Sequence, residues 1–369
     1  MANPKEFKKI ARFYRIRRAA VTIIILSLVL GLIYPALADG FNDIYPFING
    51  ILIGVLGGTI ISMLEFYIFN EANKKINFIS LVIIKVLTYS IVFTVLVLGI
   101  VMISRGFKYG YSSLSEMYHS KEFDHFLYNE DLTLILSYTF IFTILIIFFK
   151  EISRKLGREV LFNFITGKYY KPRKEERIFM FLDINDSTTI AENMNELEFH
   201  TFVNMFFKDI SDAILFTRGK VYQYVGDEVI VSWSMLDGIK DANCVYAYLY
   251  ALQSIQKESD KYKKKFGFVP SFKAALHCGN VIRGEIGDVK SEIVFHGDVM
   301  NTTSRIESLC GKVNESLLIS EILVKNFPLS YRKYFNYKGS FELRGKENKV
   351  KIFCLADNTK TYLDLDQQN

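Results

Sequence analysis

The chain has 369 residues, of which 45 are basic and 39 acidic, and its formal net charge is +6. This length is sufficient for two domains. Half of the residues are hydrophobic, and the excess falls in the first 150 residues, which argues against an entirely soluble protein. The basic residues cluster beside apolar segments, so we interpret them as orienting the chain in a membrane and expect no nucleic-acid partner.

Four apolar segments follow a basic N-terminus, and each approaches the roughly 20 residues that a helix needs to cross a bilayer. They lie at residues 19–38, 47–69, 79–104 and 132–149. The connections alternate: the stretch from Asp39 to Asp43 is acidic, Lys74-Lys75 is basic, 105–131 has more acids than bases, and Lys150 begins another basic stretch. The positive-inside rule therefore predicts a multi-pass protein of the cell membrane with both termini and the C-terminal half in the cytoplasm. Four buried helices of a soluble core are the alternative.

Two charged residues, Glu65 and Lys85, lie inside these apolar segments near their expected cytoplasmic ends. A charge at mid-membrane costs about 2.5–3.5 kcal/mol, and less near the interface. We therefore expect either an ion pair between helices, which would fix their register or sense a ligand, or two side chains that extend separately to the headgroups.

The stretch 150–173 joins the two halves of the chain. Leu156, Val160 and Phe164 recur every four residues, which indicates a helix with one apolar face. We expect this helix to continue out of the membrane, to dimerise, and to end near Gly167, before Pro172. An inert spacer is the alternative.

An apolar run from Ile178 to Leu182 reads as a buried strand that ends at Asp183. The sequence Thr189-Ile-Ala-Glu192 then fits a capping box that opens a helix carrying Phe199, Phe202 and Phe206. A carboxylate at a strand end, facing a helix N-terminus, can hold a hard cation while backbone N–H groups receive phosphate oxygens. A plain turn residue is the other reading of Asp183.

Two later stretches add to this pattern. The segment 220–233 alternates like two strands joined at Gly226-Asp227, either as an ordinary hairpin or as a hairpin that places Asp227 beside Asp183. Two such carboxylates repel each other unless a cation lies between them. Further on, Asn301 and Arg305 are four residues apart and share a helix face, where they could bind a ribose and a phosphate.

Taken together, these stretches resemble the catalytic domain of class III nucleotidyl cyclases, the adenylate and guanylate cyclases. The resemblance covers roughly residues 174 to 356 and includes the stretch from Ala275 to Gly287. It implies an α+β, ferredoxin-like domain that forms its active sites in a homodimer. It also implies conversion of a nucleoside triphosphate, with ATP favoured, to a 3′,5′-cyclic monophosphate and pyrophosphate.

The resemblance assigns a role to each matching position. Asp183, Asp227 and the Ile184 carbonyl would hold two Mg²⁺ or Mn²⁺ ions per active site, one activating the ribose 3′-hydroxyl and the other binding the triphosphate. Asn301 would orient the ribose and Arg305 would stabilise the α-phosphoryl transition state, with the metal ligands and these two residues coming from different subunits. The remaining substrate-binding candidates are Ser187 and Thr188 at the helix start, and Arg344 and Lys346 for the terminal phosphates.

The positions that read the base depart from the family pattern. Gln223 stands three residues before Gly226, where adenylate cyclases have a lysine, and Val294 stands three before Gly297, where they have an aspartate. A glutamine both donates and accepts hydrogen bonds, and valine does neither through its side chain. ATP is therefore favoured by frequency in the family, and GTP or a pyrimidine triphosphate stays open.

We thus predict an α-helical membrane domain at 1–149, a linker at 150–173, an α+β cyclase domain at 174–356 and a tail at 357–369. The alternatives are a silent nucleotide-binding signalling protein and a transporter with a regulatory nucleotide domain.

Within the cyclase domain we expect Trp233 in the core and His277 and His296 in structural roles. The four cysteines show no CxxC spacing and indicate reduced thiols. The expected elements are strands 177–183, 219–225, 228–233, 270–278, 282–287, 292–296, 336–343 and 349–356, and helices 189–216, 239–264, 298–310 and 320–325.

Overall fold

A computed structural model of the chain describes residues 4–38, 43–69, 76–111, 113–128, 130–156, 158–346 and 348–356. The predicted basic connection at Lys74-Lys75, most of the acidic one that starts at Asp39, and the tail 357–369 lie outside these residues. The chain divides into two compact units, Phe13–Thr166 and Gly167–Asn369, the second also taking in Met1–Arg12. Each unit is described by itself.

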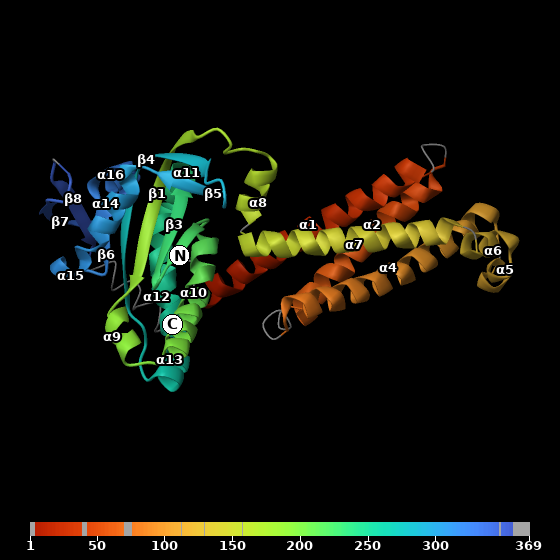
Figure 1. The fold of residues 1–369 in the computed structure, drawn as a ribbon, viewed down its shortest axis with the longest axis horizontal. Coiled ribbons are helices and arrows are strands. Elements are labelled where there is room, and N and C mark those ends of the chain that lie inside the picture. The colour runs from red at the N-terminus through yellow and green to blue at the C-terminus, as the bar shows by residue number, and fades with distance from the viewer. Residues whose placement is uncertain are drawn as a thin grey trace. The chain divides into compact units, whose positions relative to one another are not determined.

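The first unit is built from four long helices that lie alongside one another (Figure 1). They are α1 (Pro4–Ala38), α2 (Tyr45–Leu64), α4 (Phe78–Tyr109) and α7 (Glu130–Leu156), and α2 ends in a π-helical turn, η1 (Glu65–Phe69). Shorter helices complete the unit: α5 (Leu114–Tyr118), α6 (Lys121–Tyr128) and α8 (Arg158–Ile165).

Each long helix contains a stretch that is long and apolar enough to cross a membrane: Ala19–Leu37, Tyr45–Phe69, Phe78–Tyr109 and Leu132–Ser153. These stretches confirm the four apolar helices. Large apolar side chains on them are exposed, for example Ile25 at 56%, Ile79 at 71% and Ile141 at 55%. Such a continuous apolar surface is rare on a soluble domain and suits contact with lipid, which disfavours four helices buried in a soluble core.

Glycines let α1 and α2 approach each other closely. Gly50, Gly54 and Gly58 recur every four residues along α2 and are buried. A Cβ atom added to Gly50 would lie 2.0 Å from the carbonyl oxygen of Gly31 on α1, and one added to Gly54 would lie 2.7 Å from that of Ser27. Small residues at this spacing are a common way to bring membrane helices into backbone contact, so a larger residue at Gly50 would force the two helices apart.

The stretch that follows the four apolar helices is helical in its described residues, as predicted. It comprises the end of α7 and the helix α8 (Arg158–Ile165), and it ends before Gly167, whose φ of +61° lies in the left-handed region. The helix thus ends where the sequence indicated, at a residue without the Cβ that makes this conformation costly. The side chain of Leu156 is outside the described part, and dimerisation of this helix stays a prediction.

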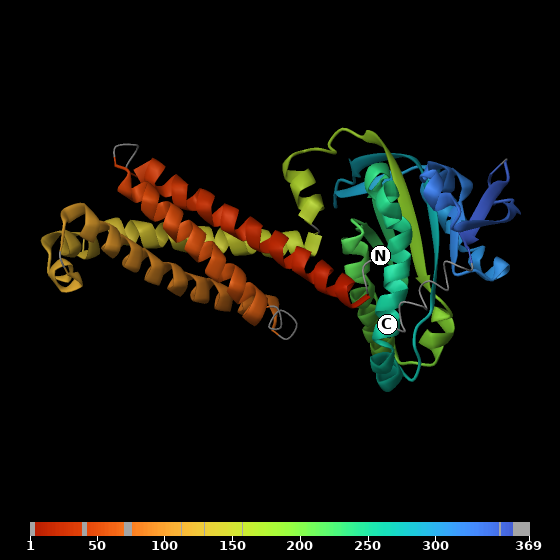
Figure 2. The same ribbon diagram turned by 180° about the vertical axis from the view of Figure 1, so that it is seen from behind.

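The second unit is an α+β domain around one mixed sheet, shown from both sides in Figures 1 and 2. The strand order is β2-β3-β1-β4-β6-β8-β7, and β5 pairs with β4 as a hairpin. All pairings are antiparallel except that of β4 with β6. The strands are β1 (Arg173–Ile184), β2 (Lys220–Val225), β3 (Glu228–Ser234), β4 (Phe272–Ile286), β5 (Glu292–His296), β6 (Leu317–Ser320), β7 (Phe335–Phe341) and β8 (Val350–Leu355).

The two faces of the sheet are covered by different elements. On one face, Ile178, Met180 and Leu182 of β1 pack under α10 (Glu196–Phe216) and α12 (Asn243–Lys257), which lie side by side in Figure 2. On the other face, Phe179 and Phe181 pack against β5 and α14 (Asp298–Glu307). The alternation of side chains along β1 thus supplies residues to the cores on both faces.

The other helices are α9 (Ser187–Glu192), α11 (Met235–Ile239), α13 (Ser259–Phe266), α15 (Cys310–Val313), α16 (Glu321–Asn326), α17 (Leu329–Arg332) and the 3₁₀ turn η2 (Lys240–Ala242).

The predicted helix 189–216 and its capping box at Thr189 are wrong. The structure has two helices, α9 and α10, and the cap of the longer one is Asn195, whose side chain accepts a hydrogen bond of 2.8 Å from the backbone N–H of Glu198. Asn195 and Glu198 have the same spacing as Thr189 and Glu192, and asparagine is the stronger N-cap residue. Phe202 and Phe206 are fully buried as expected.

Other predicted boundaries also need correction. Strands 270–278 and 282–287 are one long strand, β4, because Gly279 and Asn280 continue the pairing with β1. Helix 239–264 is divided among α11, η2, α12 and α13 at the left-handed residues Asp241 and Ala242 and near Glu258. Helix 298–310 ends at Glu307. The buried strand β6 was not predicted, because four apolar residues carry too short a pattern.

The expected core residues are found. Trp233 is fully buried, and its indole N–H donates to the carbonyl oxygen of Thr217 at 2.9 Å. His277 is buried with its Nδ1 2.7 Å from the hydroxyl of Ser320, which confirms a satisfied structural histidine, whereas His296 is exposed at the end of β5. All four cysteines are free and buried, as expected of reduced thiols.

Candidate functional site

Asp183 lies near the end of β1, in the centre of the sheet. It pairs with Glu228 of β3 on one side and with Lys273 of β4 on the other. The apolar run before it is fully buried, so the carboxylate stands where the buried strand reaches the surface. Its side chain is 22% exposed and lies 3.4 Å from the Lys273 ammonium.

Asp227 is brought to the same place by the hairpin of β2 and β3. Gly226, at φ +63°, and Asp227 form the turn between these strands, as predicted. The Asp227 side chain shares a hydrogen bond with that of Asp183. Burial, this hydrogen bond and the nearby charge of Asp227 together raise the pKa of Asp183 to about 7. The structure therefore brings the two predicted carboxyl groups together in one cluster of acidic residues.

Three further charged residues belong to this cluster, and the sequence reasoning missed them. Burial and the charge of Asp183 raise the pKa of Glu228 to about 7. Lys273 connects Asp183 to Glu307, the last residue of α14, with 2.9 Å between its Nζ and a Glu307 oxygen. Glu228 directly follows Asp227 and could have been noticed, but Lys273 and Glu307 carry no local motif. Four carboxyl groups thus share one lysine.

The cluster fits divalent cations. Carboxylate oxygens are the ligands that Mg²⁺ prefers, usually one or two of them together with water and phosphate. Among the described residues no three His, Cys, Asp or Glu side chains form a complete cation cage, so the pair Asp183 and Asp227 is the candidate ligand set. The raised pKa of Asp183 fits this reading, because two close carboxylates without a cation retain a proton.

The other candidates near Asp183 lie in the segment that follows it. Ile184 ends β1 with its side chain buried and pairs with Phe272. Ser187 and Thr188 form the first turn of α9, directly after Asp186, which adopts the left-handed conformation at φ +55°. These three residues thus follow Asp183 closely along the chain, and their roles stay predictions.

The two positions that would read the base lie on strands that meet. Gln223 is exposed on β2, where it pairs with Ile230. Val294 is half-buried on β5 and pairs with Gly284 of β4. Their neighbours, Tyr222 and Phe295, are in ring contact with centroids 5.0 Å apart. Gln223 and Val294 therefore belong to one region of the domain surface.

A second group of candidates gathers on α14. Asn301 and Arg305 are one turn apart, as predicted, with Asn301 exposed. The Arg305 guanidinium lies against Gly345, since a Cβ added there would be 3.6 Å from its terminal nitrogens. Lys346 forms an ion pair with Asp298, the first residue of α14, and Arg344 is exposed in the same turn. The structure thus brings Asn301, Arg305 and the basic turn together.

The α14 group and the carboxylate pair have no direct contact in the described part of the chain. The hydrogen bonds and ion pairs of the described residues do not join Asn301 or Arg305 to Asp183 or Asp227. These residues link the two groups indirectly, through Glu307 and Lys273. One copy of the chain therefore presents a carboxylate pair and, beside it, a group with basic side chains.

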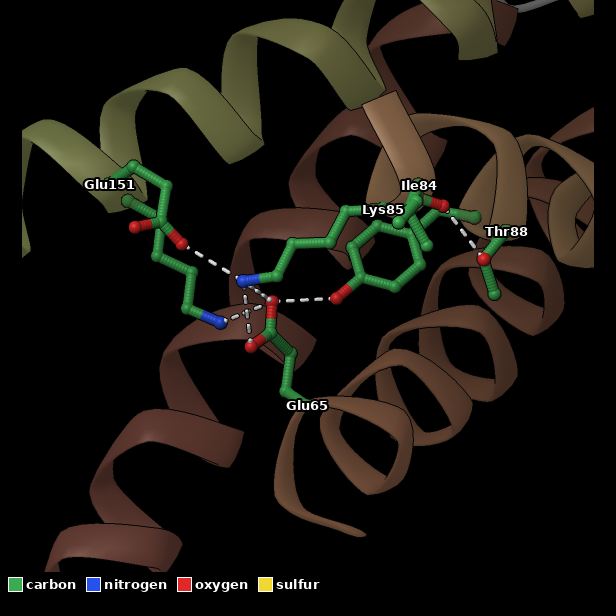
Figure 3. A network of polar contacts seen from close by, with 7 residues as sticks. Glu65, Ile84, Lys85, Thr88 and Glu151 are labelled. Carbon is green, nitrogen blue, oxygen red and sulfur yellow. Dashed lines mark hydrogen bonds and ion pairs between the residues drawn. The ribbon is translucent and has the colours of Figure 1, made fainter. Parts of the chain in front are cut away.

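A buried charge network lies in the first unit, where the sequence left open either an ion pair between Glu65 and Lys85 or two separate side chains. Lys85 is fully buried and lies 3.1 Å from Glu65, which confirms the ion pair and shows that Lys85 does not extend to a headgroup. Figure 3 shows that Lys85 also reaches Glu151 of α7, at 2.9 Å. Lys85 therefore connects three helices through two carboxylates.

Two further residues complete the network. The Tyr89 hydroxyl donates to Glu65 at 2.6 Å, and the Lys150 ammonium lies 2.7 Å from the same carboxylate. Glu65 also opens the π-helical turn η1, and such turns are frequent at functional sites. Among the described residues, two glutamates thus meet two lysines, and pairing of this kind is what buried ions require.

Comparison with known proteins identifies the second unit. The family described as the adenylate and guanylate cyclase catalytic domain matches residues 169–358. Adenylate cyclase 2 of Rhizobium meliloti is 33% identical over 211 residues, which are 57% of this chain and 58% of that protein. The adenylate cyclase of Anabaena cylindrica is 27% identical over 47% of this chain and 35% of that protein.

The chain is also similar to solved structures of cyclases. The adenylyl cyclase CyaB from P. aeruginosa is 18% identical, with 51% of this chain and 96% of that chain covered and a TM-score of 0.43. The chain covers less than two thirds of the length of each curated relative named above. The family match spans more than half of the chain, from the linker to the last strand. The chain therefore belongs to the adenylate and guanylate cyclase catalytic domain family.

Proposed function

We propose that the protein is a membrane-bound nucleotidyl cyclase that converts ATP to 3′,5′-cyclic AMP and pyrophosphate. The observation that carries this proposal is the pair Asp183 and Asp227, joined by a hydrogen bond and short of positive charge, in a chain of the cyclase family. The relatives named adenylate cyclase support ATP. Because Gln223 and Val294 depart from the family pattern, GTP and pyrimidine triphosphates are part of the test.

The reaction joins two atoms of one nucleotide. The ribose 3′-oxygen attacks the α-phosphorus, its proton leaves, and the bond from the α-phosphorus to the bridging oxygen breaks to release pyrophosphate. Asp183, Asp227 and the Ile184 carbonyl would hold two Mg²⁺ or Mn²⁺ ions, which when bound would neutralise the triphosphate and favour ionisation of the 3′-hydroxyl. Asp183 must lose its proton before it can serve as a ligand.

The α14 group acts on the rest of the nucleotide. Arg305 presents a planar cation to the phosphoryl oxygens, where charge grows in the transition state. Asn301, one turn away, donates to the ribose and fixes its orientation. Arg344 and Lys346 bind the terminal phosphates, for which Lys346 exchanges its partner Asp298 for substrate. Backbone N–H groups at Ser187 and Thr188 contribute further donors to the phosphates.

The active enzyme is a homodimer in this proposal. The carboxylate pair and the α14 group are two half-sites without direct contact among the described residues of one chain, and a second copy can bring them together. Strand β2 supports an interface, because it is exposed on both faces and carries Val221, Tyr224 and Val225 at 37%, 51% and 49% exposure. An apolar strand of this kind needs a partner to be shielded from water.

The membrane placement belongs to the same proposal. The four apolar helices anchor the protein in the cell membrane, with both termini and the cyclase domain, 174–356, in the cytoplasm where nucleotides are found. The linker 150–173 connects the two parts. A reporter fused to the C-terminus checks this topology, since an extracytoplasmic reporter would overturn it.

The full chain, purified in detergent or in membranes, tests the activity. It is incubated with Mg²⁺ or Mn²⁺ and ATP, GTP, CTP or UTP, and the products are separated by chromatography. We expect cyclic AMP and pyrophosphate from ATP, abolished by Asp227→Ala and unchanged by Asp260→Ala, an exposed aspartate on α13. Absence of any cyclic nucleotide from all four substrates would sink the proposal.

Mixing two inactive variants tests the dimer. Asp227→Ala lacks the carboxylate half-site and Arg305→Ala lacks the other, so their heterodimer holds one intact site. Random mixing should restore about a quarter of the wild-type activity. Restoration requires that the two half-sites come from different copies, and a mixture that stays inactive while each variant still dimerises contradicts the shared site.

A further inference from the structure

A linker residue, Tyr169, is built into the cyclase domain. Its side chain is only 2% exposed, although the neighbouring Tyr170 is 79% exposed. The Tyr169 hydroxyl donates to Glu175 at 2.7 Å and accepts from Arg283 at 2.8 Å. Its carbonyl oxygen accepts from the backbone N–H of Glu285 at 3.1 Å. Tyr169 therefore fastens the end of the linker to β4 with both its main chain and its side chain.

The contact continues from Tyr169 to β5. The Arg283 guanidinium lies over the Tyr169 ring at 4.3 Å and over the Phe295 ring at 5.0 Å. Arg283 and Phe295 are directly paired across the hairpin of β4 and β5, so they share one face. Arg177 of β1 lies 5.1 Å from the same Phe295 ring and pairs with Glu175 at 3.2 Å. Two buried guanidinium groups thus hold Phe295 in place.

Phe295 in turn contacts β2. Its backbone N–H donates to the Tyr222 hydroxyl at 3.4 Å, and the two rings are in contact. Tyr222 is the extra residue of a β-bulge, because the pairing of β2 with β3 shifts between Val221 and Gln223. Bulges often aim a neighbouring side chain at an active site. The neighbour here is Gln223, and the residue before Phe295 is Val294.

The linker also touches the strand that faces Val294. Gly284 pairs directly with Val294, and a Cβ added to Gly284 would lie 3.2 Å from the side chain of Pro172. The segment from Tyr169 to Pro172 therefore runs along the three residues of β4 that lie opposite or beside Val294 and Phe295. A shift of this segment must move β4 and β5 or break the contacts.

We propose that Tyr169 is a positioning residue. It fixes the positions of the strands that carry Gln223 and Val294, and it thereby determines the affinity and the base preference for the nucleotide. The path runs from Tyr169 through Arg283 to Phe295, and from Phe295 to the bulge at Tyr222. The inference rests on the proposed function, in which Gln223 and Val294 contact the base. Neither Tyr169 nor Arg283 touches the nucleotide in this scheme.

The test compares two adjacent tyrosines in the full chain. Tyr169→Phe keeps the ring over Arg283 and removes the hydroxyl that Arg283 and Glu175 share, and Tyr170→Phe is the matched exposed control. The measurements are kcat and KM for the triphosphate that the wild type converts, the inhibition constants of the other triphosphates, and the melting temperature. We expect Tyr169→Phe to raise KM about threefold or more and to change the ranking or spacing of the inhibition constants.

A merely structural tyrosine would behave differently. It would lower the melting temperature while leaving KM and the inhibition constants equal to those of Tyr170→Phe, and this result would overturn the inference. A fall in kcat alone would overturn it as well, because loss of base positioning weakens binding in the ground state and the transition state alike and so appears in KM.

A second variant keeps the test decisive if Tyr169→Phe loses its fold. Glu175→Gln retains Tyr169 and weakens both the acceptor of its hydroxyl and the ion pair to Arg177, which contacts the same Phe295 ring. It should shift KM and the inhibition constants in the same direction. Unchanged binding in Glu175→Gln then counts against the inference. Asp227→Ala distinguishes failure of the proposed function from failure of the positioning role. If Asp227→Ala abolishes turnover while Tyr169→Phe matches the control, the proposed function stands and the positioning role fails.

Discussion

The protein contains two clusters of buried charge that differ in their balance. In the first unit, the described contacts bring Glu65 and Glu151 to Lys85 and Lys150, so each carboxylate meets a cation. In the cyclase domain, Asp183, Asp227, Glu228 and Glu307 gather around Lys273. Among the described residues, the first cluster is therefore balanced, whereas the second has more carboxylates than cations.

The difference indicates different purposes. A balanced buried network satisfies its members and holds helices in one register, which is a structural task. An unbalanced carboxylate cluster costs folding free energy and is maintained where a positive ligand completes it. Charge balance, more than burial, therefore distinguishes the part of this protein that holds helices together from the part that we propose binds substrate.

The largest expected effect comes from removing one carboxylate of the unbalanced cluster. Asp183→Asn should lower cyclase activity by about 100-fold to 1,000-fold or more, the scale of losing a main electrostatic contact to the transition state. The same change should raise the stability of the metal-free protein at pH 8 by roughly 1–3 kcal/mol, because it relieves repulsion. Activity assays and thermal melts check both, with Asp260→Asn as control. A metal-free variant less stable than the wild type would contradict the comparison.

Removing a charge from the balanced cluster should lower the stability of the protein, whereas removing Asp183 should raise it. Lys85→Met leaves Glu65 and Glu151 without their shared cation, and breaking a buried pair costs about 3–5 kcal/mol. Thermal melts in detergent should show a large loss for this variant and a smaller loss for Lys150→Met, because Lys150 is one third exposed.

A double variant sharpens this prediction. Lys85→Met combined with Glu151→Gln removes one charge of each sign and should regain part of the lost stability. Additive losses would mean that Lys85 and Glu151 do not interact. Full assembly and activity of Lys85→Met would remove the role of the network altogether.

The pH dependence separates the two clusters further. The pKa values of Asp183 and Glu228 are raised to about 7, so the folded protein holds more protons than the unfolded chain from about pH 4 to pH 7. The stability of the metal-free domain should therefore fall as the pH rises through this window. Mg²⁺ or Mn²⁺ should offset the loss and raise the melting temperature more at pH 8 than at pH 6.

Asp183→Asn is the control for this effect. Without the carboxylate that titrates near pH 7, the response to the cation should be small at both pH values. An equal response of the wild type at pH 6 and pH 8 would mean that protons and cations do not compete at this site.

The smallest expected effect concerns Lys346, which forms an ion pair with Asp298. Asp298→Asn should free the lysine and lower KM for the triphosphate by about twofold, since an exposed ion pair contributes about 0.2–1 kcal/mol. Glu292→Gln, which frees the exposed Lys290 elsewhere on the surface, is the control. A rise in KM would mean that Asp298 positions Lys346 instead of competing for it.

Local patterns in the sequence were sufficient where the physical cause is local. The apolar segments, the Gly226-Asp227 turn, the buried strand before Asp183 and the one-turn spacing of Asn301 and Arg305 all depend on neighbouring residues. The helix start was misplaced because Thr189 and Asn195 both fit a cap, and the helix uses Asn195, the stronger N-cap residue. The four-residue glycine spacing on α2 is a local pattern of the same kind.

The sequence by itself determined a four-helix apolar half, an α+β half and the residues of a cyclase motif, because periodicity and turn chemistry act over a few residues. Only the tertiary structure decided which charges meet. Lys85 lies 66 residues from Glu151, and Lys273 and Glu307 reach Asp183 from two other elements. Electrostatic energy depends on distance in space and on burial, and neither is written in the local pattern of the chain.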